Sequence, residues 1–412
     1  MDELDALREM RTTLAREENS EQLAMRVGWR ADVSSQRRRR ALKLPPSFKL
    51  PLVSLAAVTA VAAGAVAVLT LPSDSAGTGT GGPGKTGAGP VPGNALLVAA
   101  TSAEKGKTGK YWHSRLIEGE IFAAGKSAAD HYKIVSLQRY EGWAAQDGNG
   151  WWGDQDLPAR PWTPQDKQKW QAAGSPSRLE VPSAEGPVTM FLKNSNTGLS
   201  VRPSPPNDDG VFYGLTQKQF VALPAEPARL QNALLNLKGH WRAYQANGPE
   251  EPMRALRGKA RSRALSDVAE SLLSTAPTPP ALRAATYRML AALPGVKAEG
   301  TTTDPLGRTG TAISLPVDST VPLGLYTAPK QLGTYRRQWI IDPGTGALLA
   351  VRDLVVTPPR GSRKLPPGDN GKPRSLRVKD MPDRFHKPGE IASYKVFELG
   401  EWTDTGPKLP PQ

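Results

Sequence analysis

The chain has 412 residues, with 39 prolines, 40 glycines and a formal net charge of +14, and most of the positive charge lies after residue 71. It contains no cysteine, which excludes disulfides, thiol catalysis and cysteine-ligated zinc. A positive domain outside the cell is attracted to anionic envelope components such as phospholipid headgroups or teichoic-type polymers. Solubility alone explains the same charge, and both interpretations stay open.

Residues 1–49 are predicted to form a cytoplasmic segment. Its apolar residues fall at helical spacing on one thin stripe, formed by Leu4, Leu7, Met10 and Leu14, which is typical of a helix that docks on a partner protein. The alternative is a solvated helix beside the lipid headgroups. The segment ends in a basic cluster made of Arg37, Arg38, Arg39, Arg40, Lys43 and Lys49.

The stretch from 50 to 71 reads LPLVSLAAVTAVAAGAVAVLTL and carries no charge over about 22 residues, and roughly 20 residues cross a bilayer as a helix. The basic cluster before it predicts a cytoplasmic N-terminus and an exported C-terminal part by the positive-inside rule. A cleaved signal peptide is the competing interpretation, but the long N-terminal region and the poor cleavage site after Leu71 disfavour it. We therefore expect a single transmembrane helix in the cell membrane.

Residues 72–94 are predicted to be a flexible linker rich in glycine and proline. Within it, residues 79–86 match the phosphate-binding pattern G-x-x-x-x-G-K-T. A phosphate-binding loop needs a short strand before it and a helix after it. The apolar run before this match is too long for such a strand, and the following TGAGPVPG cannot begin a helix, so the match is interpreted as a composition effect.

Residues 95–405 are predicted to form an extracytoplasmic α+β domain, followed by a disordered tail at 406–412. Alternation of apolar and polar residues predicts strands at 108–122, 131–148, 188–193 and 210–214. Apolar residues at helical spacing then predict three helices, one from Glu226 to Tyr244, one around 265–272 and one over 278–293.

Strand patterns return after the helices, at 295–303 and 310–316, in a hairpin formed by 334–342 and 347–357, and in a final strand over 391–402. A basic, proline-rich loop is expected at 358–374. In the sequence DPGTG, Asp342 is expected in the turn of the hairpin. An order of strands, helices and strands predicts an antiparallel curved sheet with a central helical segment.

The residues that carry chemistry form no catalytic or metal-binding motif. The four histidines lack partners at metal spacing, and neither H-E-x-x-H nor G-x-S-x-G occurs. We therefore predict no enzyme activity, no cofactor, no metal and no nucleic-acid partner. The strongest local feature is aromatic, with Trp143, Trp151, Trp152 and Trp162 interleaved with Asp, Asn and Gly. These indoles form either a surface that binds glycan or lipid or core plugs between turns, and a hydrolytic carboxylate pair among them is a further alternative.

Several stretches resemble an actinobacterial family of single-pass membrane proteins whose genes often lie beside a sigma-factor gene. They are the opening MDELDALREMR, the RRRR cluster before one membrane helix, the linker, ATYRMLAALPGV at 285–296 and RRQWIIDPGTGALLAVRDLV at 336–355. The layout of the exported domain also resembles the half-barrel of periplasmic lipoprotein carriers and of a sensor domain that regulates anti-sigma factors. The resemblance implies an envelope sensor whose cytoplasmic segment binds a sigma factor, although the histidine and cysteines of zinc-binding anti-sigma factors are absent.

The sequence thus predicts a membrane-anchored, non-enzymatic protein that binds or senses an envelope ligand and regulates a sigma factor. The alternative is a domain that binds or hydrolyses envelope glycan, or binds lipid, through its tryptophan-rich surface.

Overall fold

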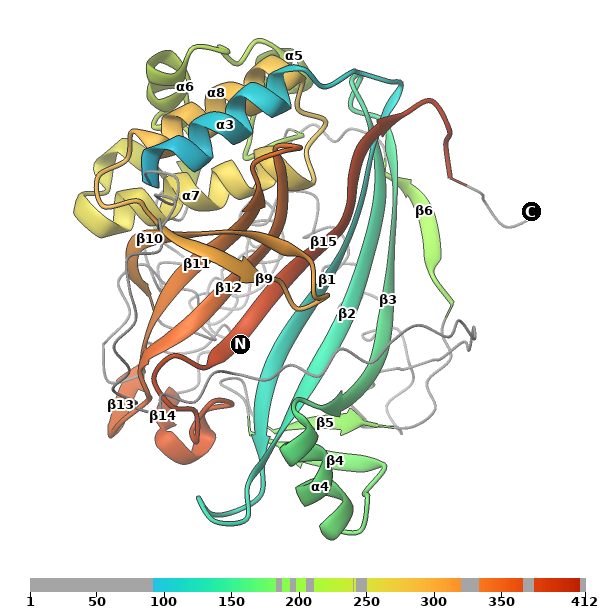
Figure 1. Ribbon diagram of the computed structural model, residues 1–412, viewed down its shortest axis with the longest axis vertical. Helices are drawn as coiled ribbons and strands as arrows, with labels where there is room; N and C mark the ends of the chain where they lie inside the picture. Colours follow the sequence, from blue (N-terminus) through green and yellow to red (C-terminus); the bar gives the residue numbers. More distant parts are fainter. Residues whose placement is uncertain are drawn as a thin grey trace, which may run out of the picture.

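A computed structural model describes residues 92–182, 187–192, 198–204, 211–239, 241, 250–319, 333–365 and 374–407. Its centre is an antiparallel sheet of nine strands in the order β6-β3-β2-β1-β15-β12-β11-β10-β9, with long strands that bend along their length (Figure 1). The strands are β1 Tyr111–Ala124, β2 Tyr132–Ala145, β3 Gly150–Pro161, β6 Ser200–Ser204, β9 Lys297–Thr303, β10 Thr309–Ser319, β11 Thr334–Asp342, β12 Ala347–Thr357 and β15 Ile391–Thr403. The α+β class and the large antiparallel sheet are as predicted.

Five helices lie at one end of the molecule (Figure 1). They are α3 Pro92–Glu104, α5 Gln217–Val221, α6 Pro227–Leu234, α7 Gly258–Ser274 and α8 Pro280–Ala291. The other end carries α4 Pro164–Ala172 with the small β4–β5 hairpin, Arg178–Val181 and Val188–Phe191. Further short elements are β7 Lys238–Gly239, β8 Glu251–Pro252, β13 Ser362–Leu365, β14 Arg374–Arg377 and the 3₁₀ turns Met253–Ala255 and Val378–Asp380.

The last strand holds the two halves of the sheet together. β15 pairs with β1 on one side and with β12 on the other, in both cases antiparallel. The pairing with β1 matches Trp112 with Trp402 and shifts register at Arg115 and Leu116. Strand pairing between residues almost 300 positions apart therefore joins the two ends of the domain sequence in one sheet. The helices between β6 and β9 interrupt the sequence of strands but not the sheet.

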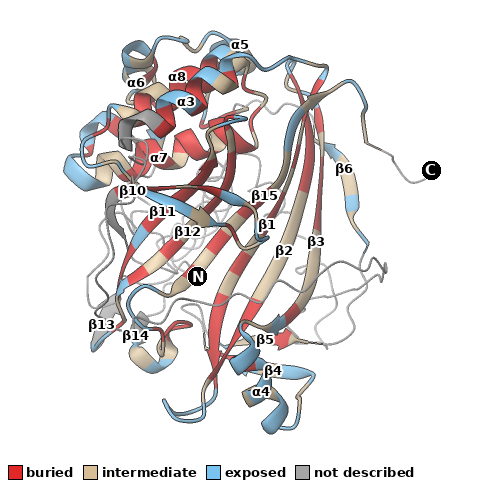
Figure 2. Cartoon of the chain, viewed as in Figure 1, coloured by how far each residue is buried: buried red, intermediate tan, exposed pale blue. Residues whose placement is uncertain are grey.

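The main hydrophobic core lies between the helices and one face of the sheet. It joins α3, α7 and α8 to side chains of β10, β11 and β12, with Trp339 fully buried at its centre. Figure 2 shows buried residues along the strands and on the inner sides of these helices, while α4 is mostly exposed. Because neighbouring residues of a strand point to opposite faces, Trp339 faces the helices and Ile340 belongs to a second cluster on the other face.

Local sequence signals explain where several helices begin. In α4, Thr163 caps the helix in a reciprocal capping box with Asp166, which satisfies two backbone donors. In α6, the Glu226 side chain accepts from two amides and Pro227 occupies the first turn. The predicted helix over 226–244 therefore starts as expected, but it ends at Leu234.

The other differences from the sequence predictions are an earlier start of one helix, two elements that were not predicted, and two segments with another local structure. α3 begins at Pro92, inside the stretch predicted as linker, and β3 and α4 were not predicted. The predicted strand at 210–214 is an isolated bridge between Phe212 and Leu215, and the loop predicted at 358–374 contains β13. The remaining predicted strands and the helices α7 and α8 are present.

Candidate functional site

An open cleft of about 660 Å³ lies at one end of the sheet, where β1 begins and the turn at 146–149 joins β2 to β3. Its walls include Lys110, Tyr111, Gln146, Asp147, Trp151 and Pro203. The cleft is built on paired strands, because Tyr111 pairs with Ala145 and Trp151 pairs with Pro203 of β6. Its shape is thus fixed by the register of the sheet.

Aromatic rings line up across the strands on this face. The register places His113 opposite Trp143, and Trp143 opposite Trp151. The His113 and Trp143 rings stack with centroids 4.2 Å apart, and Tyr111 meets Trp151 edge-on at 5.6 Å. Trp143, in the middle of this row, is 8% exposed and does not line the cleft, whereas Trp151 is half-buried and lines it.

Polar groups line the same cleft at the turn. The Asp147 carboxylate accepts hydrogen bonds from the Asn149 backbone amide at 2.9 Å and from its side-chain amide at 3.0 Å. These bonds from Asn149 lower the pKa of Asp147, so that the carboxylate is charged at neutral pH. The Gln217 side chain of α5 donates to the Gln146 carbonyl, which ties the turn to the helical end of the molecule.

A second carboxylate, Glu141, lies two residues before Trp143 on β2 and therefore on the same face of the sheet. Its Oε1 is 2.8 Å from Nε2 of His113 and accepts from Nη2 of Arg115 at 3.0 Å. Burial acts to raise the pKa of Glu141, but the hydrogen bonds from His113 and Arg115 outweigh it and lower the pKa. Glu141 is therefore a charged group whose partners are His113 and Arg115, and it orients the His113 ring that stacks on Trp143.

The four predicted tryptophans do not share one surface. Trp152 points to the opposite face from Trp151 because the two residues are neighbours on β3, and it is 4% exposed and stacks on Tyr140. Trp162 lies at the far end of β3 and packs on Tyr394 at 5.7 Å. Trp143 is buried within the row, so Trp151 is the member of the set that lines the cleft.

Sequence reasoning did not single out Tyr111, Lys110, Gln146 or Pro203 as site residues. The alternation around Tyr111 predicts its strand, but the pairing of β1 with β2 and of β3 with β6 brings these residues together. The one available signal was that Asp147 and Asn149 follow an apolar strand and precede Trp151, which is typical of a turn flanked by aromatic residues.

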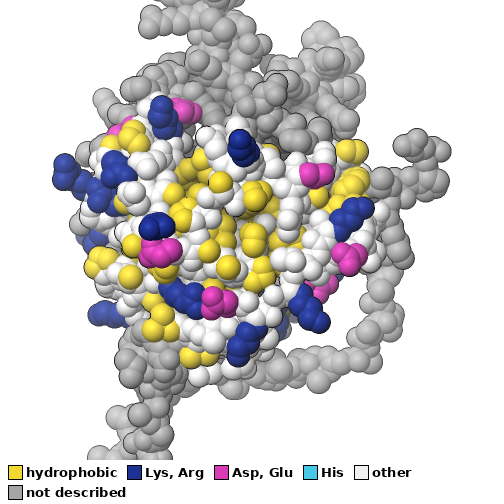
Figure 3. Space-filling view, turned by 90° about the horizontal axis from the view of Figure 1, so that it is seen from above, with side chains coloured by type: hydrophobic (Ala, Val, Ile, Leu, Met, Phe, Trp, Pro, Cys, Tyr) yellow, Lys and Arg dark blue, Asp and Glu magenta, His cyan; other side chains and the backbone are white. Residues whose placement is uncertain are grey.

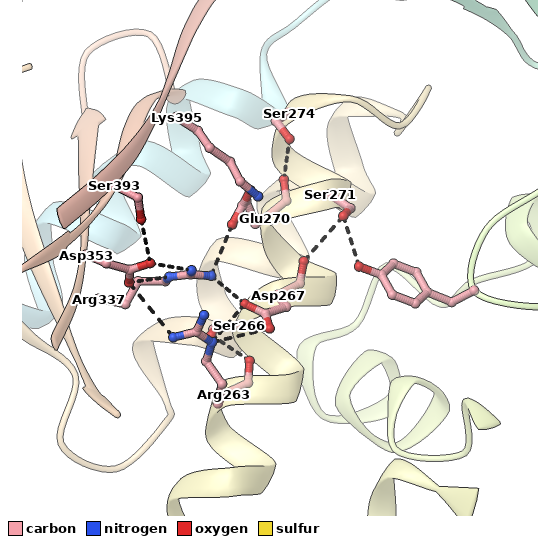
Figure 4. Close-up of polar contacts among 11 residues, drawn as sticks. Arg263, Ser266, Asp267, Glu270, Ser271, Ser274, Arg337, Asp353, Ser393 and Lys395 are labelled. Carbon is pink, nitrogen blue, oxygen red and sulfur yellow. Dashed lines mark hydrogen bonds and ion pairs between the residues drawn. The ribbon is translucent and has the colours of Figure 1, made fainter. Parts of the chain in front are cut away.

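A cluster of charged side chains joins α7 to the sheet (Figure 4). Arg337 donates to Asp353 at 2.8 and 3.0 Å and to Asp267 at 2.6 Å, and Lys395 donates to Glu270 at 2.6 Å. Burial acts to raise the pKa of Asp353, but Arg337 and other cations hold it at about 2. The positive side chains of the cluster are paired with its carboxylates. The cluster is explained by structure alone, because it connects α7 to strands β11, β12 and β15.

Other predicted sites lie outside the described residues. These are the stripe of Leu4, Leu7, Met10 and Leu14, the basic cluster from Arg37 to Lys49, and the predicted membrane span at 50–71. Within the described ranges, no helix is long and apolar enough to cross a membrane, and no group of three His, Asp or Glu side chains is arranged to hold a metal ion. No family model, no curated protein and no solved structure matches the chain.

Proposed function

We propose that the chain is a single-pass membrane protein whose extracytoplasmic domain binds an envelope glycan in the cleft beside Trp151, without catalysing a reaction. The observation that carries this proposal is the half-buried Trp151 indole, which meets Tyr111 edge-on in an open cleft. The polar side chains of Gln146, Asp147 and Asn149 line the same cleft. An extracytoplasmic location follows from the sequence prediction of one membrane span before this domain.

The chemistry of the cleft matches a sugar ring. A pyranose has an apolar C–H face, which packs on an indole, and a rim of hydroxyls, which need hydrogen-bond partners. Here Trp151 offers the flat apolar surface, while Asp147 and Gln146 offer acceptors and a donor at its edge. Binding sites typically combine an apolar wall with a few polar groups that fix orientation.

The carboxylates of this face fit binding better than hydrolysis. A glycosidase needs one carboxylic acid whose pKa is raised so that it can protonate the leaving group. Asp147 and Glu141 are two carboxylates beside the aromatic row, and the pKa of each is lowered by its hydrogen bonds. Both groups are thus set to remain charged, and neither suits the role of general acid.

Replacing Trp151 by Ala tests the proposal. We expect the full-length Trp151→Ala protein, in detergent, to lose pelleting with purified cell-wall sacculi by about tenfold or more, because the stacking surface is gone and such aromatic contacts dominate recognition. Trp162→Ala is the matched control, since Trp162 is also half-buried but packs on Tyr394. Equal pelleting of Trp151→Ala and the unmodified chain would contradict the proposal, provided that both melt at similar temperatures.

We further propose that the protein is a sensor that regulates a cytoplasmic sigma factor through residues 1–36. The support is the apolar stripe of Leu4, Leu7, Met10 and Leu14 together with the family resemblance. Crosslinking in the native host followed by mass spectrometry should recover a sigma factor with the full-length chain and not with the chain lacking residues 1–36. Both proteins keep the basic cluster and the predicted span, so a sigma factor recovered equally with both would rule out docking through this segment.

A further inference from the structure

The helical end of the molecule exposes large apolar side chains. Leu97 and Val98 of α3 are 48% and 41% exposed, and Val221 of α5 is 58% exposed. Leu97, Val98 and the exposed Thr101 follow helical spacing, so they lie on one outer stripe of α3. Figure 3 looks onto this end and shows apolar side chains gathered in its middle, with both basic and acidic side chains around them. We call Leu97 and Val98 the apolar patch.

The exposed charge of the helical end is predominantly positive. Exposed basic residues of the helical segments include Lys105, Lys107, Lys218, Arg229, Arg254 and Arg257, while the exposed acids include Glu104, Glu226 and Glu250. Each Lys or Arg near an anionic bilayer adds to the electrostatic attraction between the domain and the lipid surface. An apolar centre with a basic surround is the pattern of a surface that lies on anionic lipid headgroups.

The position of the patch along the chain points to the same partner. The predicted membrane span ends at Leu71, and α3 begins at Pro92. The sequence predicts a flexible linker over the intervening 20 residues, and a linker of that length and kind has an r.m.s. length of about 25 Å. Leu97 is only five residues further along the helix, so the patch stays within a few tens of ångströms of the bilayer to which the chain is anchored.

We propose that the apolar patch docks on the anionic phospholipid surface of the membrane in which the chain is anchored, with Leu97 and Val98 inserted at the level of the headgroups. This inference rests on the membrane anchor of the proposed function. Because α3 ends at Glu104 and the wall of the cleft begins at Gly109, docking through α3 also holds the cleft close to the bilayer, where it can take glycan that lies against the membrane.

The absence of cysteine in the chain allows a clean test with single labels. The full-length Leu97→Cys protein, carrying an environment-sensitive fluorophore, is reconstituted into vesicles of phosphatidylglycerol and phosphatidylcholine with spin-labelled quencher lipids. Val356→Cys is the matched control, because Val356 is 44% exposed near the end of β12. The other end of β12 adjoins Gly346, which meets α3, and the ten residues from Ala347 to Val356 span about 30 Å.

We expect a blue-shifted emission at position 97 and quenching roughly twofold or more above that at position 356, since an inserted side chain reaches the headgroup boundary. Loss of this difference in vesicles of phosphatidylcholine alone supports the assignment of an anionic surface, and an equal difference there contradicts it. Equal quenching at both positions in the anionic vesicles overturns docking. Alkaline extraction of the same vesicles separates the two proposals: a chain that is extracted has no membrane span, whereas a retained chain with unquenched position 97 refutes docking alone.

Discussion

Asp383 is a buried acid with an incomplete set of partners. The Tyr335 hydroxyl donates to its Oδ2, while its Oδ1 has no partner among the described residues. Burial raises the pKa of Asp383 to about 6. An acid whose pKa is raised on folding adds stability at low pH and loses that contribution as the pH rises through the folded-state value. Asp383 therefore opposes folding when it is charged at neutral pH.

Replacing Asp383 by Asn removes this titration. We expect the unfolding free energy of the unmodified chain, measured relative to Asp383→Asn, to fall by on the order of 2–3 kcal/mol between pH 4.5 and pH 7.5. Urea denaturation of both proteins at the two pH values measures the difference. His386 titrates in the same range, because burial and Lys133 lower its pKa to about 4. His386 is present in both proteins, so its contribution largely cancels. A difference that does not change with pH would contradict the assignment.

At the scale of elements, the β11–β12 turn is the point where the sheet meets α3. Asp342 accepts from the Gly344 amide and from the Thr345 hydroxyl at 2.9 and 2.7 Å, as its predicted place in the turn requires. Gly346 has a φ of +72°, and a Cβ there would lie 2.7 Å from the Ala103 amide and the Ala99 carbonyl. The glycine is needed both for the backbone angle and for the close approach of the helix.

Gly346→Ala should therefore destabilise the protein by more than the strain of a positive φ. Gly307→Ala is the matched control, because Gly307 has a φ of +80° with open space around it. We expect Gly346→Ala to cost about 1–3 kcal/mol more than Gly307→Ala in urea denaturation, from overpacking against α3. Equal costs would show that α3 does not approach the turn as closely as described.

Elements with strong local signals in the sequence were predictable. A helix made mostly of small and apolar residues, and strand pairings between distant residues, were not. The hairpin at 334–357 shows alternation around a Pro-Gly turn, and α8 is bounded by prolines and Pro294-Gly295. By contrast, α3 contains mostly small and apolar residues without a cap signal, which made it continuous with the predicted linker. The helix predicted to Tyr244 was too long because Leu237 and Trp241 continue its spacing, although they are buried after the helix has ended.

At the scale of the whole molecule, the order of strands, helices and strands was enough to predict an antiparallel α+β fold. The position of β15 between β1 and β12 was not predictable, because no local pattern specifies a pairing between residues near 115 and residues near 395. The candidate site depends on such pairings. The sequence singles out Trp151, but its contact with Tyr111 and its separation from Trp152 follow from strand register and alternation.

The central claim is that Trp151 forms the stacking wall of a glycan site. Calorimetric titration of the full-length chain in nanodiscs with soluble peptidoglycan fragments tests it most directly, with Trp151→Ala and the conservative Trp151→Phe compared. We expect Trp151→Ala to weaken the affinity by about tenfold or more and Trp151→Phe to retain most of it, because a phenyl ring keeps a flat apolar face. Unchanged affinity in Trp151→Ala, with the fold intact by circular dichroism, would contradict the account.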